Sequence, residues 1–261
     1  MNIFKSLSSY SLYIVTGILF LFLYIPIFVL IVFSFNNSYT PYQWGGLTLQ
    51  WYYNAFTSSQ ALQALKNSGI VALSSSLLSV VMGTLFVLYS AHSRLQIITP
   101  LFLSSLGIPE IIIAVGLLHI FSMFVIPLGL TALIAGHTLL GLGYVIPMLS
   151  VRYSELDKRY WEASLDLGAS EVQTYKRIIL PLLRSTLFTA ALLVFIISLD
   201  DFLIAFFCSS PTSQTLPLYI FSVIRSGATP EVNALSTIMI VLSSALVLLI
   251  SRFSGRQGAI L

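Results

Sequence analysis

Long apolar stretches separated by short polar segments dominate the pattern of the chain. An α-helix crosses the hydrocarbon core of a bilayer with about 20 consecutive apolar residues. Strand-like alternation and internal repeats of useful strength do not appear. The pattern predicts an all-α polytopic membrane bundle, in which residues 1–261 form a single transmembrane domain. Six stretches are close to the spanning length, at about 10–35, 67–90, 97–124, 129–149, 185–209 and 234–251.

Composition supports an integral membrane protein. Hydrophobic residues make up 57% of the chain and charged residues only 8%, with a mean hydropathy of +0.95. Soluble domains carry about 25% charged residues. The net charge of +3 does not indicate a nucleic-acid partner, because the basic residues sort by loop instead of forming one face. The single cysteine, Cys208, excludes an intrachain disulfide and a thiolate metal cluster, so we expect it to serve packing.

The distribution of basic residues predicts the orientation. If the amino terminus is cytoplasmic, only Lys66 and Arg225 of the 12 basic residues fall in outer segments. Cytoplasmic loops carry an excess of Lys and Arg. We therefore expect both termini and the polar loop 150–184 inside the cell. The first apolar stretch lacks a small-residue cleavage site and is predicted to be a retained span, not a signal peptide.

Two outer segments have distinct characters. Segment 36–66 is rich in Tyr and Trp, which favour the membrane–water interface, and we expect an interfacial helix around 49–56. The alternative is an aromatic site for a cationic ligand. Segment 210–233 contains several Pro and Gly residues and is predicted to be a structured turn region that faces whatever delivers a substrate.

The polar loop 150–184 carries local signals for helix ends. Asp157 is a suitable cap for a following helix, and Gly168 suits the left-handed conformation that ends one. Ser170 and Gln173 then have the spacing of a capping box. These signals predict two short helices with a bend at Gly168, outside the bilayer.

Acidic residues within predicted spans are the candidate chemistry: Glu110, Asp200 and Asp201. Each costs about 3 kcal/mol at the centre of a lipid-facing helix, so each is expected to face a cavity or a partner. No intramembrane Lys or Arg is available, which makes a cationic substrate the natural counter-charge. The alternatives are pairing with another subunit, or a protonated, hydrogen-bonded acid.

Geometry refines that expectation. By the helical rise, Glu110 and Asp200 fall at similar depth in their spans. Adjacent residues on a helix point about 100° apart, so Asp200 and Asp201 cannot both face one pore, and sequence does not decide which one does. Pro109 is expected to kink the third span.

The remaining residues do not suggest catalysis. His92 is expected to be solvated, and His119 and His137 to be hydrogen-bonded interior residues, not metal ligands. The chain has no Gly-rich loop of the kind that cradles nucleotide phosphates, and no nucleophile–base constellation is discernible. We therefore expect a non-enzyme in which another subunit hydrolyses any ATP.

The polar loop resembles the EAA loop of ATP-binding cassette importer permeases. The residues that carry the resemblance are Glu162, Ala163, Ser164, Gly168, Ile178, Leu180 and Pro181. In that family the loop forms a cytoplasmic coupling helix that docks into a groove of the ATPase subunit. Ser164 departs from the usual alanine but keeps its small size. The alternative is a cytoplasmic loop of solvated helices without a docking role.

Almost the whole chain is similar to the C-type permease subunits of spermidine/putrescine importers. The matching stretches are YIPIFVLIVFSFN at 24–36, IPEIII at 108–113, LDLGASE at 165–171, SLDDFLIAFF at 198–207 and LPLYIFSVIRSGATPEVNALSTI at 216–238. The resemblance implies a type I importer permease that works by alternating access in a bacterial inner membrane. It also implies a second permease subunit, two copies of an ATPase that binds ATP and Mg, and a periplasmic polyamine-binding protein. No cofactor is implied for this chain.

Three functions follow for testing. The first is a polyamine importer permease with Glu110, Asp200 and Asp201 as the cation path and the EAA-like loop as the ATPase contact. The second is a permease for another small solute, such as an iron-loaded or phosphonate ligand, which the intramembrane acids disfavour if the solute is anionic. The third is a channel or carrier that works alone, which has no use for a docking helix; copurification with an ATPase separates it from the others.

Overall fold

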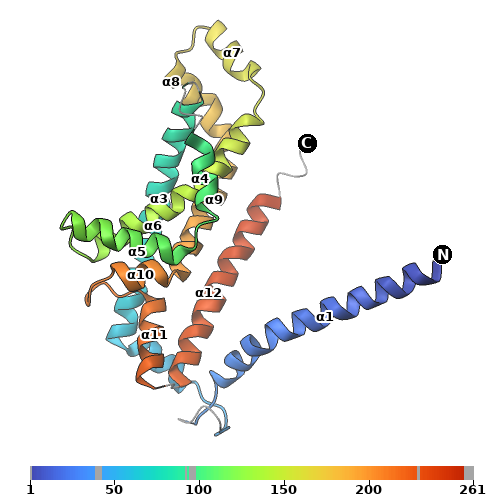
Figure 1. The fold of residues 1–261 in the computed structure, drawn as a ribbon, viewed down its shortest axis with the longest axis vertical. Helices are drawn as coiled ribbons and strands as arrows, with labels where there is room; N and C mark the ends of the chain where they lie inside the picture. Colours follow the sequence, from blue (N-terminus) through green and yellow to red (C-terminus); the bar gives the residue numbers. More distant parts are fainter. Residues whose placement is uncertain (1, 39–42, 92, 94–97, 228–229, 256–261) are drawn as a thin grey trace. The chain divides into compact units, whose positions relative to one another are not determined.

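The computed structural model describes residues 2–38, 43–91, 93, 98–227 and 230–255, and no strand occurs among them beyond an isolated bridge between Asn36 and Leu47. The predicted all-α fold is therefore confirmed (Figure 1). In chain order the helices are α1 (Asn2–Phe33), α2 (Gln50–Thr57), α3 (Ser59–Ser90), α4 (Thr99–Ser105), α5 (Glu110–Met123), α6 (Leu130–Ser154), α7 (Arg159–Asp166), α8 (Glu171–Thr174), η2 (Tyr175–Ile179), α9 (Leu180–Asp200), α10 (Leu203–Cys208), α11 (Leu216–Ser226) and α12 (Pro230–Gly255).

Five helical segments among the described residues are long and apolar enough to cross a membrane. They are Tyr13–Phe33, Ser59–Ser90, Leu130–Ser154, Glu171–Asp200 and Pro230–Leu249. The third predicted span, 97–124, is not one straight helix, because α4 and α5 meet at 111° (Figure 1). Counted as one bent span, the pair makes six.

Pro109 explains why this span is bent. It precedes the first residue of α5 with a ψ of 129°, far from the helical value. A proline lacks the backbone donor of a continuing helix and disfavours helical geometry in the residue before it, here Ile108. The expected kink is thus a full break. Glu110 is the first residue of α5. Its depth in the membrane therefore cannot be calculated from the helical rise along a continuous span 97–124.

The predicted span 185–209 also ends earlier than expected. Helix α9 stops at Asp200, and Asp201 takes an extended conformation with a ψ of 129°. A separate short helix, α10, follows. The two acidic residues therefore stand at a break in the helix, and not in its middle.

Residues Gln63–Tyr219 and Leu242–Leu261 form one compact unit. Its core joins α5, α6 and α10, and fully buried Cys208 packs there, which confirms its expected role. A side chain at Gly136 would come within 2.9 Å of Ile204 Cγ2 and 3.1 Å of Leu117 Cδ1. The missing side chain lets three helices approach closely, as small residues do in membrane bundles.

The other unit comprises Met1–Leu62 and Ile220–Val241. The buried side chain of Asn36 organises its first loop, since Nδ2 donates to the Gln43 carbonyl at 2.7 Å and Oδ1 accepts the Gly45 N–H at 2.8 Å. Trp51 donates its indole N–H to the Asn36 carbonyl at 2.8 Å. Trp51 lies on α2, Gln50–Thr57, so a helix is present where one was expected around 49–56, and its interfacial position stays a prediction.

Candidate functional site

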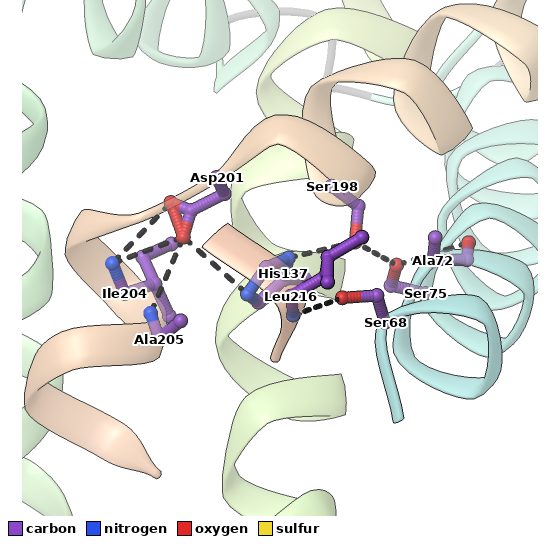
Figure 2. Close-up of polar contacts among 9 residues, drawn as sticks. All are labelled: Ser68, Ala72, Ser75, His137, Ser198, Asp201, Ile204, Ala205 and Leu216. Carbon is purple, nitrogen blue, oxygen red and sulfur yellow. Dashed lines mark hydrogen bonds and ion pairs between the residues drawn. The ribbon is translucent and has the colours of Figure 1, made fainter. Parts of the chain in front are cut away.

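The break between α9 and α10 is built around Asp201. Its side chain is buried and accepts the backbone N–H of Ile204 at 3.0 Å and that of Ala205 at 3.3 Å (Figure 2). The first amides of a helix have no partner within the helix, and a carboxylate there satisfies them and complements the helix dipole. Asp201 thus caps α10 from inside the protein.

Asp200 has the opposite environment. It is exposed and its Oδ1 accepts a hydrogen bond from Ser243 of α12 at 2.9 Å. The expectation that the two adjacent acids point in different directions is confirmed: Asp201 is buried and Asp200 is exposed. In the part of the chain that the structure describes, no Lys or Arg forms an ion pair with Asp200.

Glu110 begins α5 and lines a cavity of about 550 Å³. The cavity wall is mostly apolar, with Ser105 of α4 and Tyr144 of α6 as further polar groups. The carboxyl group of Glu110 also interacts with that of Asp201. The structure therefore brings Glu110 and Asp201 together, although the acids sit on separate helices. The cavity has room for an alkyl chain, and its one acid can bind an ammonium group.

His137 connects α6 to the same break. It is 1% exposed, its Nδ1 lies 2.7 Å from Ser198 Oγ, and its Nε2 lies 3.5 Å from Asp201 Oδ1 (Figure 2). Ser75 of α3 donates to Ser198 at 3.2 Å. The expectation of a hydrogen-bonded interior histidine is confirmed for His137. Among the described residues, no three His, Cys, Asp or Glu side chains gather as metal ligands would.

The expectation is wrong for His119, which is exposed on α5. Helix α5 turns Leu117 and Phe121 toward the core. A residue two positions from each points about 200° away from it, so His119 falls on the opposite face. His92 lies outside the described residues.

Sequence reasoning missed Ser198 and Ser75. A signal for Ser198 was present, because Ser198 and Asp201 are three residues apart and so share one face of a helix. A histidine within a span needs a polar partner, and that face offers two. Ser75 lies in a run of serines on α3 that gives no such indication.

The polar loop has the local structure that its sequence predicts. Asp157 Oδ1 accepts the Arg159 N–H at 2.9 Å at the start of α7. At its end Gly168 has a φ of +83°, its N–H bonds to the Leu165 carbonyl, and the Ala169 N–H bonds to the Ser164 carbonyl. This double closure is the Schellman motif.

The second helix begins with the predicted capping box. Ser170 Oγ accepts the Gln173 N–H, and Gln173 Oε1 accepts the Ser170 N–H at 3.0 Å. It is not a separate short helix, however, because α8 continues through the π-helical turn η2 into α9. Pro181 follows that turn, and it lacks the N–H that a regular helix would use. A wider turn before it is one way to accommodate the missing bond.

The EAA-like residues divide between surface and interior. Glu162, Ala163 and Gly168 are exposed, as is Pro181, whereas Ser164 is buried. Ser164 Oγ lies 2.7 Å from Thr174 Oγ1, so its small side chain lets α7 approach α8 closely. Ile178 and Leu180 are half-buried. The exposed residues leave one edge of α7 available to a partner.

Glu162 also lines a cavity of about 770 Å³ beneath α7. Its walls include Val87 from the end of α3 and Tyr153 from the end of α6. Trp161 and Tyr175 contact each other nearby, with ring centroids 4.8 Å apart and ring planes tilted by 54°. This ring contact joins α7 to the turn η2 that follows α8.

Comparison with solved structures shows the fold. A bacterial ABC transporter that imports the acidic polysaccharide alginate has a chain that matches with a TM-score of 0.75 and 18% identity, over 98% of both chains. The same transporter in complex with an alginate pentasaccharide-bound periplasmic protein matches with a TM-score of 0.75 and 19% identity, over 98% of this chain and 96% of that one.

Sequence relatives are closer. The spermidine/putrescine transport system permease protein PotC of Haemophilus influenzae is 39% identical over 89% of this chain and 91% of the relative. PotC of Escherichia coli K12 is 35% identical over 88% of both chains. The putrescine transport system permease protein PotI of the same organism is 31% identical over 85% of this chain and 82% of the relative.

The family assignment agrees with the geometry. The apolar helices suit a multi-pass protein of the inner membrane. Residues 75–257, most of the chain, match one protein family. This chain belongs to the family of binding-protein-dependent transport system inner membrane components.

Proposed function

We propose that the chain is the permease subunit of an ATP-driven polyamine importer and forms half of its translocation path. The observation that carries the proposal is the acid group at the α5 and α9–α10 helix ends, Glu110, Asp200 and Asp201, which has no Lys or Arg partner in the described chain. Relatives named as spermidine/putrescine and putrescine permeases support the same substrate class.

The acids have different parts in this proposal. Glu110, on the wall of the 550 Å³ cavity, and exposed Asp200 accept hydrogen bonds from the ammonium groups of the polyamine. Asp201 is too buried to touch the substrate, and its part is to hold the α9–α10 break by accepting the Ile204 and Ala205 N–H groups. The attraction between Glu110 and an ammonium group is stronger in an interior of low polarity than in water. Tyr144 and Phe102 on the cavity wall offer aromatic faces to a cation.

Coupling to ATP hydrolysis is assigned to α7 and the turn at Gly168. Exposed Glu162 and Ala163 present a carboxylate and a small surface to a groove of the ATPase. Leu167, 89% exposed beside Gly168, adds an apolar contact. In the proposed assembly a second permease completes the path, two copies of a cytoplasmic ATPase bind ATP and Mg, and a periplasmic polyamine-binding protein delivers the substrate. Both termini of this chain are cytoplasmic.

Reconstitution of the whole assembly in proteoliposomes tests the proposal. The binding protein is loaded with spermidine, with putrescine, or with a phosphonate as the control, and both ATP turnover and solute uptake are measured. We expect a polyamine to accelerate ATP turnover and to accumulate in the lumen. Stimulation by the phosphonate alone would assign the chain to another solute, and uptake without any ATPase would assign it to the independent carriers.

A further inference from the structure

A line of buried polar side chains crosses the bundle from α3 to the start of α10 (Figure 2). It consists of Ser75 on α3, Ser198 on α9, His137 on α6, and Asp201 at the α9–α10 break, exposed by 0%, 4%, 1% and 6%. The proposed function gives a role to the acid but none to the other three. Buried polar groups cost free energy unless they are paired, so such a line requires a reason.

The direction of the hydrogen bonds can be worked out from one end. The Ser75 hydroxyl hydrogen is shared between Ser198 Oγ at 3.2 Å and the Ala72 carbonyl oxygen at 3.3 Å, which leaves the hydrogen of Ser198 for His137 Nδ1 at 2.7 Å. A neutral imidazole carries a single hydrogen. With Nδ1 as acceptor, that hydrogen is on Nε2. Nε2 is buried, makes no hydrogen bond in the described chain, and faces Asp201 Oδ1 at 3.5 Å.

We propose that His137 is a positioning residue of the cation path and acts through Asp201. Its Nε2, 3.5 Å from Asp201 Oδ1, attracts the carboxylate electrostatically and keeps it over the first amides of α10. The held carboxylate fixes the break between α9 and α10, and the break sets the place of Asp200 and keeps Asp201 beside Glu110. This inference rests on the proposed function, because a positioning residue needs a path to position.

The environment of Asp201 explains why a third donor matters. Two backbone amides, of Ile204 and Ala205, already donate to the carboxylate, while Glu110 adds a neighbouring carboxyl group. A second acid at close range disfavours two ionised groups. The Nε2–H group of His137, close to Oδ1, offsets part of that repulsion and disfavours other rotamers of Asp201. Networks of this kind are strong in an interior only when each member is satisfied.

Amide exchange of α10 gives a test that does not depend on transport. In the reconstituted complex we expect His137→Leu to speed hydrogen–deuterium exchange of peptide 203–208 by about tenfold, because the cap is less firmly held. His137→Gln retains an N–H donor at the end of its side chain and should restore most of the protection. Thr138→Val is the matched control, since Thr138 is buried on the same helix and its hydroxyl bonds only to the Ile134 carbonyl.

Uptake by the same complexes tests the path itself. We expect His137→Leu to lower polyamine uptake per assembled complex by about tenfold and to lower it no further in an Asp201→Asn background, since residues that act through one another are not additive. Unchanged amide exchange of peptide 203–208 in the His137→Leu variant overturns the inference. A double variant whose fold-loss of uptake equals the product of the two single losses overturns it as well. If wild-type complex moves no polyamine, the proposed function fails instead, and the exchange data still decide the role of His137.

Discussion

At the scale of single residues, the decisive feature is the different fate of two adjacent acids. Asp201 is taken into the interior as the cap of α10, and Asp200 is left exposed at the end of α9. Sequence could predict that they diverge, because a helix turns about 100° per residue. It could not predict which one points inward, since that depends on where α9 ends and on which amides of the next helix need an acceptor.

Asp200→Asn tests the exposed acid. The substitution keeps the size and the hydrogen bond from Ser243 but removes the negative charge. We expect polyamine uptake to fall by about tenfold or more while assembly persists, because a hydrogen bond to a charged group contributes about 1.5–3 kcal/mol. Radiolabelled uptake per complex, with copurified ATPase as the measure of assembly, checks this.

Glu155→Gln is the matched control for that experiment. Glu155 is an exposed acid of segment 150–184, and among the described residues it is paired only with Arg152, at 2.9 Å. Exposed ion pairs contribute about 0–1 kcal/mol, so this loss of the same charge should leave uptake unchanged. Equal uptake by wild type and the Asp200→Asn variant would remove Asp200 from the path.

At the scale of helices, the sequence predicted structure well where a feature depends only on residues close by in the chain. The capping box at Ser170 and the left-handed turn at Gly168 are both as expected, because a cap depends on residues within one turn. Apolar stretches were less informative. Hydropathy records composition and not backbone angles, so 97–124 was predicted as one span although Pro109 breaks it. The continuation of α8 into α9 was missed for the same reason.

Close helix packing at Gly141 leads to a stability prediction. A Cβ at Gly141 would meet Ser79 Oγ and would lie 2.7 Å from Val194 Cγ1, so Gly141→Ala forces α6 away from α3 and α9. Overpacking of this kind costs about 1–3 kcal/mol. We expect a lower midpoint of thermal unfolding for the purified complex in detergent. A helix interior otherwise prefers Ala to Gly, so any loss of stability must come from the contacts.

Gly116→Ala on α5 is the control, because, apart from its chain neighbours and the backbone of its own helix, no described atom lies within 4 Å of the added Cβ. It should leave the unfolding midpoint unchanged or slightly raised. If the Gly141→Ala variant is as stable as the Gly116→Ala variant, α6 can shift without loss of stability. The close approach of α3, α6 and α9 would then not contribute to the stability of the protein.

At the scale of the whole molecule, one inference from sequence supports both halves of the proposal: the segment 150–184 lies in the cytoplasm. The prediction rests on the location of basic residues and agrees with a docking role for α7, yet neither observation fixes the side of the membrane by itself. The substrate acids and the coupling helix belong to one mechanism only if ATP is hydrolysed on the side where α7 is exposed.

Cysteine labelling in intact cells decides the orientation. The native thiol, Cys208, is fully buried and should not react with a membrane-impermeant maleimide. A thiol introduced by Glu155→Cys, at the exposed end of α6, should react only after the membrane is permeabilised, whereas Tyr53→Cys on α2 should react in intact cells. These outcomes put the EAA-like segment beside the ATPase and the aromatic helix toward the binding protein. The reverse pattern would separate α7 from any cytoplasmic motor, and no arrangement of the acids could then couple ATP hydrolysis to import through this chain.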